Sequence, residues 1–269
     1  MRNPTRRNRN IGTAKRGHGQ DNRHSIPTHT YASRSWKETL HTHQQFWCPV
    51  GDREVCFIIE ENARGCVHAC TVDDIRHVLE MIPSSDWVGI ECIVLRQPTA
   101  KQATLNPVWG RLSYTANLGA VAGKDVYLGP VIMLDACPAG AQFKWPKSLG
   151  PEGTKELARL RDDGHQVIDE GRHYLIATTP DTVRSTQLYR TLLHEIGHWL
   201  DFLQKVERRY DDNPDSYGQL VDRYFQRPQD EREAFAHRYA DEMRRQLVDR
   251  GIIPFERDAV PKWKRRPNV

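Results

Sequence analysis

The chain has 269 residues, of which 38% are hydrophobic and 28% are charged, with 18 glycines and 16 prolines, so collagen-like, coiled-coil and wholly disordered proteins are excluded. Apolar stretches such as residues 126–136 stop far short of the ~20 residues that a membrane-spanning helix needs, and no apolar segment typical of a secretory signal follows the Arg-rich start. We therefore expect a cytoplasmic protein that does not enter a membrane.

The net charge of +4 is unevenly distributed along the chain. Residues 1–35 carry eight basic residues and one acid, and residues 262–269 carry four basic residues, which leaves −7 for the remainder. Residues 1–35 also hold few large apolar side chains, so we expect a disordered basic N-terminal tail. This tail and a basic C-terminal tail at 256–269 could contact nucleic acid weakly through counterion release, or could simply be solvated.

The N-terminal half of the globular region predicts strands and one helix. Strands are expected at residues 54–60, 87–96 and 108–114. A helix is expected to begin after Thr71, which can cap its first turn, and to end before Pro83. A β-branched run at residues 125–135 contains Gly129 and Pro130; these favour an edge strand, although its apolar residues suit a core strand equally well. The role of residues 36–120 stays open.

Six cysteines could form a disulfide framework, but reduced thiols are expected in a chain of this length without a secretory signal. Cys66, His68 and Cys70 could offer three ligands to a metal. The paired CxxC spacing of structural zinc sites is missing, so small buried thiols are the simpler interpretation.

The C-terminal half predicts helices more than strands. Residues 151–163 predict a helix that ends at Gly164, and residues 166–169 and 173–178 predict a hairpin. A long helix is expected from a cap at Asp181 and Thr182 to about Val206, followed by a polar loop and a second long helix from Pro228 to before Gly251. Strands first and long helices last predict an α+β fold.

The first long helix contains the pattern His194-Glu195-Ile196-Gly197-His198. Residues four apart lie one above the other on a helix, so both imidazoles can reach one metal ion while Glu195 reaches a water beside it. The apolar stripe of this helix lies on a different face. It consists of Leu188, Leu192, Ile196, Trp199 and Leu203.

A catalytic zinc ion usually has three protein ligands, so a third must come from elsewhere. The second long helix offers Glu233 and His237 on one face, beside the small residues Ala234 and Ala236, whereas Glu231 is better placed to complement the helix dipole. Asp201 follows His198 by three residues and is expected to orient an imidazole rather than to bind the metal.

The segment from His194 to Asp201 together with Glu233-Ala-Phe-Ala resembles the gluzincin metallopeptidases, particularly compact forms and the catalytic domain of the anthrax lethal factor type. The resemblance covers about 50 residues and implies that His194, His198 and Glu233 bind zinc and that Glu195 is the general base. It also implies a substrate-side tyrosine or histidine, for which Tyr217, Tyr224 and His237 are the candidates. The expected fold is a mixed twisted sheet with an edge strand over the active site, then the active-site helix and the C-terminal ligand helix, with residues 121–255 as the catalytic core.

These residues predict a zinc-dependent endopeptidase that hydrolyses peptide bonds of a specific protein substrate, without a membrane partner. Two alternatives remain. The zinc could be structural, in a regulatory or toxin-like module whose basic tails bind nucleic acid, or the site could hydrolyse a bond other than a peptide bond. The oligomeric state is left open.

Overall fold

The computed structural model describes residues 37–105, 108–120, 125–210 and 214–257. The N-terminal tail and most of the basic C-terminal tail lie outside these residues, so the predictions made for them are not addressed by the structure. Within the described residues, no helix combines the length and the apolar character needed to cross a membrane.

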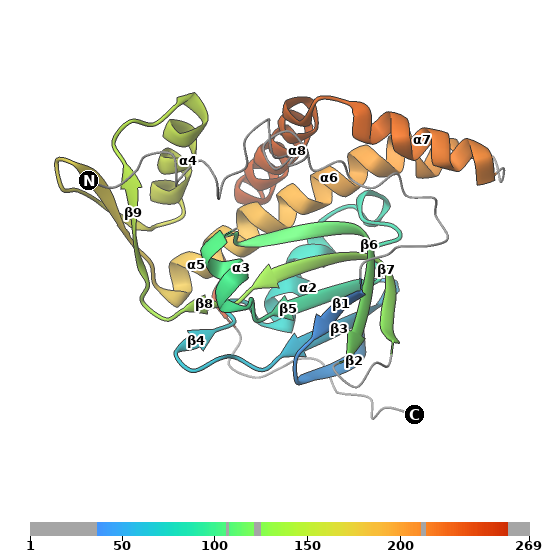
Figure 1. Cartoon of the computed structure of the whole chain (residues 1–269), viewed down its shortest axis with the longest axis horizontal. Coiled ribbons are helices and arrows are strands. Elements are labelled where there is room, and N and C mark those ends of the chain that lie inside the picture. The colour runs from blue at the N-terminus through green and yellow to red at the C-terminus, as the bar shows by residue number, and fades with distance from the viewer. Residues whose placement is uncertain (1–36, 106–107, 121–124, 211–213, 258–269) are drawn as a thin grey trace, which may run out of the picture.

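The fold is α+β, as the sequence predicts, and is built around a curled six-stranded mixed sheet (Figure 1). Its strand order is β1 (Lys37–Leu40), β6 (Gly110–Ala120), β7 (Asp125–Asp135), β5 (Cys92–Arg96), β3 (Arg53–Glu60) and β2 (His43–Val50). The pairs β1–β6, β7–β5 and β5–β3 are parallel, whereas β6–β7 and β3–β2 are antiparallel.

The helices pack mainly on one face of this sheet. They are α2 (Val72–Met81), α3 (Ala100–Leu105), α4 (Pro151–Asp162), α5 (Pro180–Thr186), α6 (Leu192–Lys205), α7 (Pro214–Gln226) and α8 (Gln229–Asp249), with 3-10 turns at Ser84–Asp86 and Glu207–Arg209. The largest core cluster joins the inner faces of β2, β3, β5 and β7 to α2, α6, α7 and α8. All five residues of the predicted apolar stripe of α6 belong to it.

A smaller lobe stands beside the main sheet (Figure 1). It contains a three-stranded antiparallel sheet of β9 (Gln142–Pro146), β11 (His173–Ala177) and β10 (Gln166–Asp169), covered by α4. A two-stranded ladder pairs β4 (Cys66–Val67), which follows β3 of the main sheet, with β8 (Cys137–Pro138), which precedes β9 of this lobe. The predicted hairpin and the predicted helix before it are both confirmed.

Several predicted boundaries are wrong. The strand expected at residues 87–96 begins only at Cys92, and the cap of the first long helical segment is Thr179, before Pro180, instead of Asp181 and Thr182. A helix, α7, replaces the polar loop expected before Pro228. A domain boundary at residue 120 is also not supported, because β6 and β7, on either side of it, pair along one ladder.

The edge-strand prediction for residues 125–135 is wrong, because β7 lies between β6 and β5. The ladder between β6 and β7 shifts register between the Ser113 and Ala116 pairs, and Pro130 falls at this irregularity. A proline inside a sheet is tolerated at such a site because no regular ladder bond is lost there.

One edge of β6 is open along most of its length. β1 pairs with β6 only from Asn117 to Ala120, so the outer edge of residues 110–116 has no partner strand among the described residues. This open edge lies next to α6, which packs against β6 (Figure 1).

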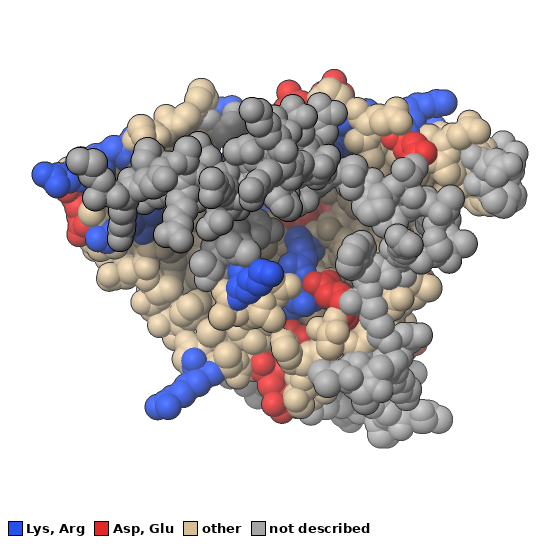
Figure 2. Space-filling model, in the orientation of Figure 1, with Lys and Arg blue, Asp and Glu red and all other residues tan. Residues whose placement is uncertain are grey.

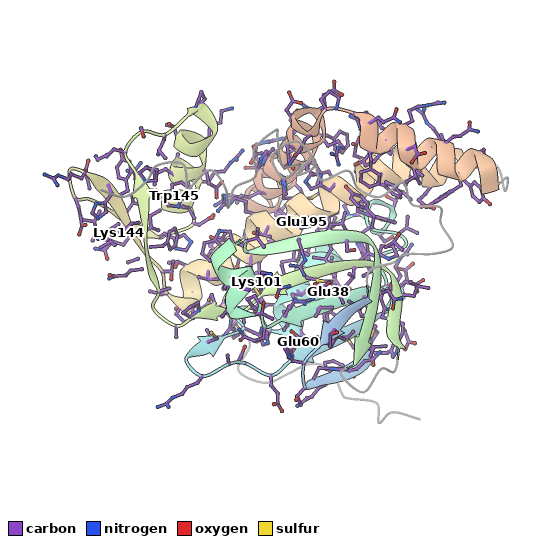
Figure 3. All side chains as sticks on the ribbon, in the orientation of Figure 1. Glu38, Glu60, Lys101, Lys144, Trp145 and Glu195 are labelled. Atoms are coloured by element: carbon purple, nitrogen blue, oxygen red, sulfur yellow. The ribbon has the colours of Figure 1, made fainter. Side chains whose placement is uncertain are left out.

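The opposite face of the main sheet carries an ion cluster near β1. Glu38 of β1 pairs with Arg96 of β5 at 2.7 Å and with Arg111 of β6 at 2.5 Å. Figure 2 shows acidic and basic side chains gathered at the centre of this view, and Figure 3 labels Glu38 there, with Lys101 and Glu60 nearby. The two ion pairs join β1 to the end of β5 and to the beginning of β6.

Candidate metal centre

A π-helical segment at Gln187–Thr191 leads directly into α6. The buried Gln187 side chain donates from Nε2 to the carbonyl oxygens of Trp109, at 2.8 Å, and Asp135, at 2.7 Å. It thereby ties the start of the helix to the beginning of β6 and the end of β7. Single π-turns are frequent at functional sites, and here the turn ends three residues before His194.

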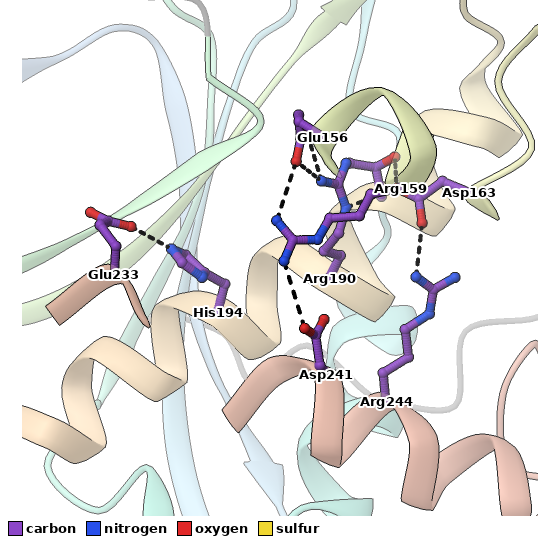
Figure 4. Close-up of polar contacts among 9 residues, drawn as sticks. Glu156, Arg159, Asp163, Arg190, His194, Glu233, Asp241 and Arg244 are labelled. Carbon is purple, nitrogen blue, oxygen red and sulfur yellow. Dashed lines mark hydrogen bonds and ion pairs between the residues drawn. The ribbon is translucent and has the colours of Figure 1, made fainter. Parts of the chain in front are cut away.

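The helix α6 brings both predicted imidazoles to one carboxylate of α8, and Figure 4 shows His194 beside Glu233. The Nε2 atom of His194 lies 3.3 Å from Oε2 of Glu233, and the Nε2 atom of His198 lies 3.4 Å from the same oxygen. The two histidine side chains are 16% and 13% exposed, so the group lies at a surface that solvent can reach. The structure therefore brings together the three residues predicted as zinc ligands.

His237 lies at the same place, one helical turn beyond Glu233. Its ring centroid is 4.4 Å from that of His194, and the ligand atoms of His194, Glu233 and His237 all lie within 4.8 Å of one another. This is the one such group of three found among the described residues. Burial, and then the neighbouring His194 and Arg159, lowers the pKa of His237 to about 4, so its ring is neutral at pH 7.

The donor atoms are of the kind that zinc binds, although the group whose ligand atoms all lie within 4.8 Å of one another contains His237 in place of His198. Zinc binds imidazole nitrogen and carboxylate oxygen at about 2.0–2.1 Å, and two ligand atoms of a tetrahedron with that bond length lie about 3.3–3.4 Å apart. The separations between Glu233 and the two Nε2 atoms agree with this value. The Nδ1 atoms of His194 and His198 are buried and have no hydrogen-bond partner in the described structure. Both Nε2 atoms are thus the ones aimed at the site.

Glu195 is buried beside these ligands, with 8% of its surface exposed. Its Oε2 accepts a hydrogen bond of 2.8 Å from the backbone N–H of Leu112 on β6. Burial raises the pKa of Glu195, and the charge of Glu233 raises it further, while His194, His198 and the Leu112 bond act in the opposite direction. A carboxylate with a raised pKa is better suited to accept a proton.

The helices α6 and α8 approach closely at Gly197. A Cβ atom placed on Gly197 would lie 2.9 Å from the Cα and 3.0 Å from the carbonyl oxygen of Ala236. A glycine inside a helix costs about 1 kcal/mol relative to alanine, which suggests a close neighbour, and Ala236 is that neighbour. The small residues allow Glu233, one turn earlier on α8, to reach both imidazoles.

The prediction that Asp201 orients an imidazole is wrong. Asp201 is completely buried, and its two oxygens pair with other groups: Oδ1 with Lys205 and Oδ2 with Arg227 at 2.7 Å. Burial alone would raise the pKa of Asp201, but the hydrogen bonds from Lys205 and Arg227 lower it overall. Asp201 therefore joins the end of α6 to the segment before α8.

The two candidate tyrosines lie in different places. Tyr217 donates its hydroxyl to Glu207 at 2.6 Å, beyond the end of α6, so the structure does not bring it to the histidines. Tyr224 is only 2% exposed, and its hydroxyl lies 3.3 Å from that of Tyr114 on β6. Burial raises the pKa of Tyr224, and so do the neighbouring Tyr114 and Asp201.

A network of charged side chains fixes the small lobe beside the site (Figure 4). Arg190 of the π segment binds Glu156 of α4 with its Nη1 at 2.5 and 2.6 Å, and binds the buried Asp163 with its Nε at 2.9 Å. Two ion pairs link this network to α8: Arg159 with Asp241, at 3.6 Å, and Arg244 with Asp163, at 3.4 Å.

The alternative metal site at Cys66, His68 and Cys70 does not form. His68 contacts the carbonyl oxygen of Glu60 through Nε2 at 2.7 Å, and Cys70 donates to Oε1 of Gln187 at 3.4 Å. All six cysteines are free thiols, as expected.

Two contacts of the site could not be predicted from the sequence. The Leu112 contact is made by a backbone N–H, which any residue except proline provides. In the sequence, Arg232 looks like any solvent-exposed arginine on a helix. Only the structure shows that it stacks on Tyr224 and Phe225. Its adjacency to Glu233 is the one sequence feature that could have drawn attention to it.

Comparisons of the chain with known protein families, with curated proteins and with solved structures give no match. The geometry of the site is therefore the basis for the assignment of a function.

Proposed function

We propose that this protein is a zinc-dependent endopeptidase in which His194, His198 and Glu233 bind the metal ion and Glu195 is the general base. The observation that carries the proposal is the equal placement of two imidazole nitrogens, at 3.3 and 3.4 Å, around one carboxylate oxygen from another helix. That separation matches the spacing of zinc ligands, and a buried glutamate lies between the two histidines in sequence.

Zinc bound there would act as a Lewis acid on the scissile carbonyl and would lower the pKa of an attacking water. Glu195 is the residue that would take the proton from such a water. Its Oε2 is fixed by the N–H of Leu112, and its Oε1 has no donor among the described residues, so Oε1 is the oxygen that receives the proton and passes it to the leaving amine. The raised pKa of Glu195 favours both transfers.

The open edge of β6 is the proposed binding surface for the substrate. Leu112 lies on this edge and contacts Glu195, so a peptide that pairs with residues 110–116 passes the general base. Extended peptides add to open sheet edges through main-chain hydrogen bonds. This assigns to β6 the role that the sequence suggested for β7.

His237 and Tyr224 are the remaining candidates for contact with the substrate. The ring of His237 packs against that of His194. Its neutral imidazole has one nitrogen that donates a hydrogen bond and one that accepts. Tyr224 can act only through Tyr114 unless the buried pair opens, since its own hydroxyl is covered. We therefore assign His237, ahead of Tyr224, as the group nearest to the reacting carbonyl.

The first prediction concerns Glu195→Gln. This variant keeps the size of the side chain and all three ligands, so it is expected to bind zinc as the wild type does while peptide cleavage falls by about 10²-fold or more. Zinc content is measured by elemental mass spectrometry, and cleavage is measured with a library of terminally blocked peptides.

The matched variants His198→Ala and Glu233→Ala are expected to lose zinc as well as activity, whereas His237→Ala keeps zinc. If the Glu195→Gln protein cleaves peptides at the wild-type rate, the mechanism is wrong. If the zinc-loaded wild type cleaves no peptide at all, the endopeptidase proposal itself fails.

A further inference from the structure

Arg232, immediately before Glu233, has no anionic partner among the residues that the structure describes. Its Nε is buried and has no hydrogen-bond partner, and no ion pair to it occurs in the described part of the chain. The acids on either side are already engaged, because Glu231 pairs with Arg227 at 3.6 Å and Glu233 lies against the two histidines.

Arg227 provides a direct comparison at the same aromatic group. Its Cζ lies 5.6 Å from the ring centroid of Tyr224, and that of Arg232 lies 5.8 Å from the same ring. Arg227 pairs with Asp201 at 2.7 Å as well as with Glu231, so its charge is compensated. Arg232 has equivalent stacking but no carboxylate partner within the described ranges of the chain.

The position of Arg232 places it at the proposed substrate edge. It stacks on Tyr224 and, at 5.5 Å, on Phe225, and both rings pack against Tyr114 of β6. Tyr114 lies two residues after Leu112, whose backbone N–H binds Glu195. Arg232 is therefore connected to the general base through this aromatic group and β6.

The stacking holds the guanidinium in place before any ligand arrives. A planar guanidinium fixed by aromatic rings binds a carboxylate through two parallel hydrogen bonds, and little further ordering is needed. One unpaired positive charge matches one carboxylate. A doubly charged phosphate is less suitable because Glu195 and Glu233 already place negative charge nearby.

We propose that Arg232 determines specificity by binding the carboxylate of an aspartate or glutamate in the peptide substrate; this rests on the proposed endopeptidase function. Leu112 faces Glu195, and Tyr114 is two residues further along β6, which is about 7 Å at the usual rise of a strand. The acidic residue of the substrate therefore lies within about three residues of the scissile bond. Antiparallel pairing with β6, the commoner kind of strand pairing, places it on the amino side of that bond.

The test uses a randomised library of terminally blocked ten-residue peptides. The zinc-loaded wild type is expected to enrich aspartate or glutamate at one position on the amino side of the cleaved bond. For the best peptide, replacement of that acid by its amide is expected to lower kcat/KM by about 10- to 100-fold, which is the usual effect of one charge-assisted hydrogen-bond pair. Arg232→Gln is expected to remove the preference, and Arg232→Lys to keep part of it.

Arg238→Gln is the matched control. Arg238 lies on the same helix and also stacks on an aromatic ring, with its Cζ 5.9 Å from the centroid of Phe235, but it is exposed. This variant is expected to keep the wild-type preference. Arg232→Glu is expected to reverse the preference towards lysine and arginine, a change that loss of packing alone does not produce.

A binding measurement separates this proposal from the endopeptidase proposal. The same library is passed over immobilised Glu195→Gln protein, and the bound peptides are identified by mass spectrometry. Acidic peptides are expected to be enriched, and adding Arg232→Gln to this variant is expected to abolish the enrichment. Equal binding of acidic and amide peptides to the Arg232-containing protein contradicts the role of Arg232, whether or not the wild type cleaves any peptide.

Discussion

Gly197 determines how closely α6 and α8 approach at the candidate metal centre. An added Cβ would meet the backbone of Ala236 at 2.9–3.0 Å, and backbone atoms cannot move aside as a flexible side chain can. The separation of the two helices at this point decides whether Glu233 reaches both imidazoles. The arrangement of His194, His198 and Glu233 therefore requires glycine, and not alanine, at position 197.

Gly197→Ala is therefore expected to destabilise the protein by about 1–3 kcal/mol, the usual cost of overpacking, and to weaken zinc binding. Gly218→Ala is the matched control. Gly218 also lies in a helix, α7, but nothing lies within 4 Å of its added Cβ, so the better helix propensity of alanine is expected to raise stability by up to about 1 kcal/mol. Denaturant unfolding and zinc titration measure both effects. Unchanged zinc affinity in Gly197→Ala would contradict the role given to this glycine.

The residues of the candidate site could be predicted because the chemistry constrains their spacing. The four-residue repeat of the two histidines needs only the geometry of one helix, and Glu233 is the acid that stands on a separate face of the next helix beside small residues. Asp201 could not be placed this way. Its partner Arg227 lies 26 residues further along the chain, in a turn between two helices.

At the level of elements, the helices with caps and a strong apolar stripe were predicted best. The helix after Thr71 has the full capping box, in which Thr71 and Asp74 each accept a bond from the other's backbone N–H, and it begins where the sequence indicates. The helix α7 is not predicted because Gly218 and several polar residues interrupt its apolar positions. The packing of Tyr217 and Tyr224 of α7 in the same core cluster as α6 is seen only in the structure.

The position of β7 in the sheet could not be predicted from its own sequence. Gly129 and Pro130 indicate an edge when the ladder is regular, but a register shift in the neighbouring strand accommodates them in the interior. Such a shift depends on the pairing of two strands and is not encoded in either strand alone.

The small lobe is fixed to the helices by Arg190, and this gives a prediction at the level of elements. Arg190→Met removes the shared partner of Glu156 and the fully buried Asp163. Because Asp163 keeps its pair with Arg244, the expected cost is about 2–3 kcal/mol, below the ~3–5 kcal/mol of a buried charge that loses its only partner. Arg245→Met is the control: Arg245 also pairs with two acids, Glu242 and Asp249, but all three are more than half exposed. Its removal is expected to cost at most about 1 kcal/mol.

Denaturant unfolding compares the two arginine variants, and limited proteolysis follows the lobe at residues 142–177. The Arg190 variant is expected to be cleaved in the lobe earlier than the wild type. Equal stability of the two variants would mean that the network does not anchor the lobe.

For the whole molecule, Asp135 at the end of β7 is expected to make stability depend on pH. Burial raises the pKa of Asp135 from 3.8 to about 6, although Arg111 and Arg96 act in the opposite direction. The folded protein therefore binds this proton more tightly than the unfolded chain does. The contribution of Asp135 is most favourable below about pH 4 and decreases as the pH rises through about 6, by on the order of 3 kcal/mol at most.

Asp135→Asn cannot ionise and keeps the shape of the side chain, so it is expected to be more stable than the wild type at pH 7, by on the order of 1–3 kcal/mol. Below about pH 4 the wild-type carboxyl is protonated too, and the difference is expected to shrink. Free energies of unfolding measured at pH steps from 4 to 8 give the difference curve. A difference that is constant over this range would show that Asp135 is not the group responsible.

The short pairing of β1 with β6 limits what the open edge can accept. β1 covers the edge from Asn117 onwards, held by Glu38, and Trp109, just before Gly110, packs against Phe143 and His165 of the small lobe. About seven residues of strand remain between these two barriers, a span of about 23 Å. A folded domain cannot place one of its own strands in so short a space. Susceptibility to cleavage would therefore depend on how readily a target protein exposes an unfolded segment of about seven residues, and stably folded proteins would not be cleaved.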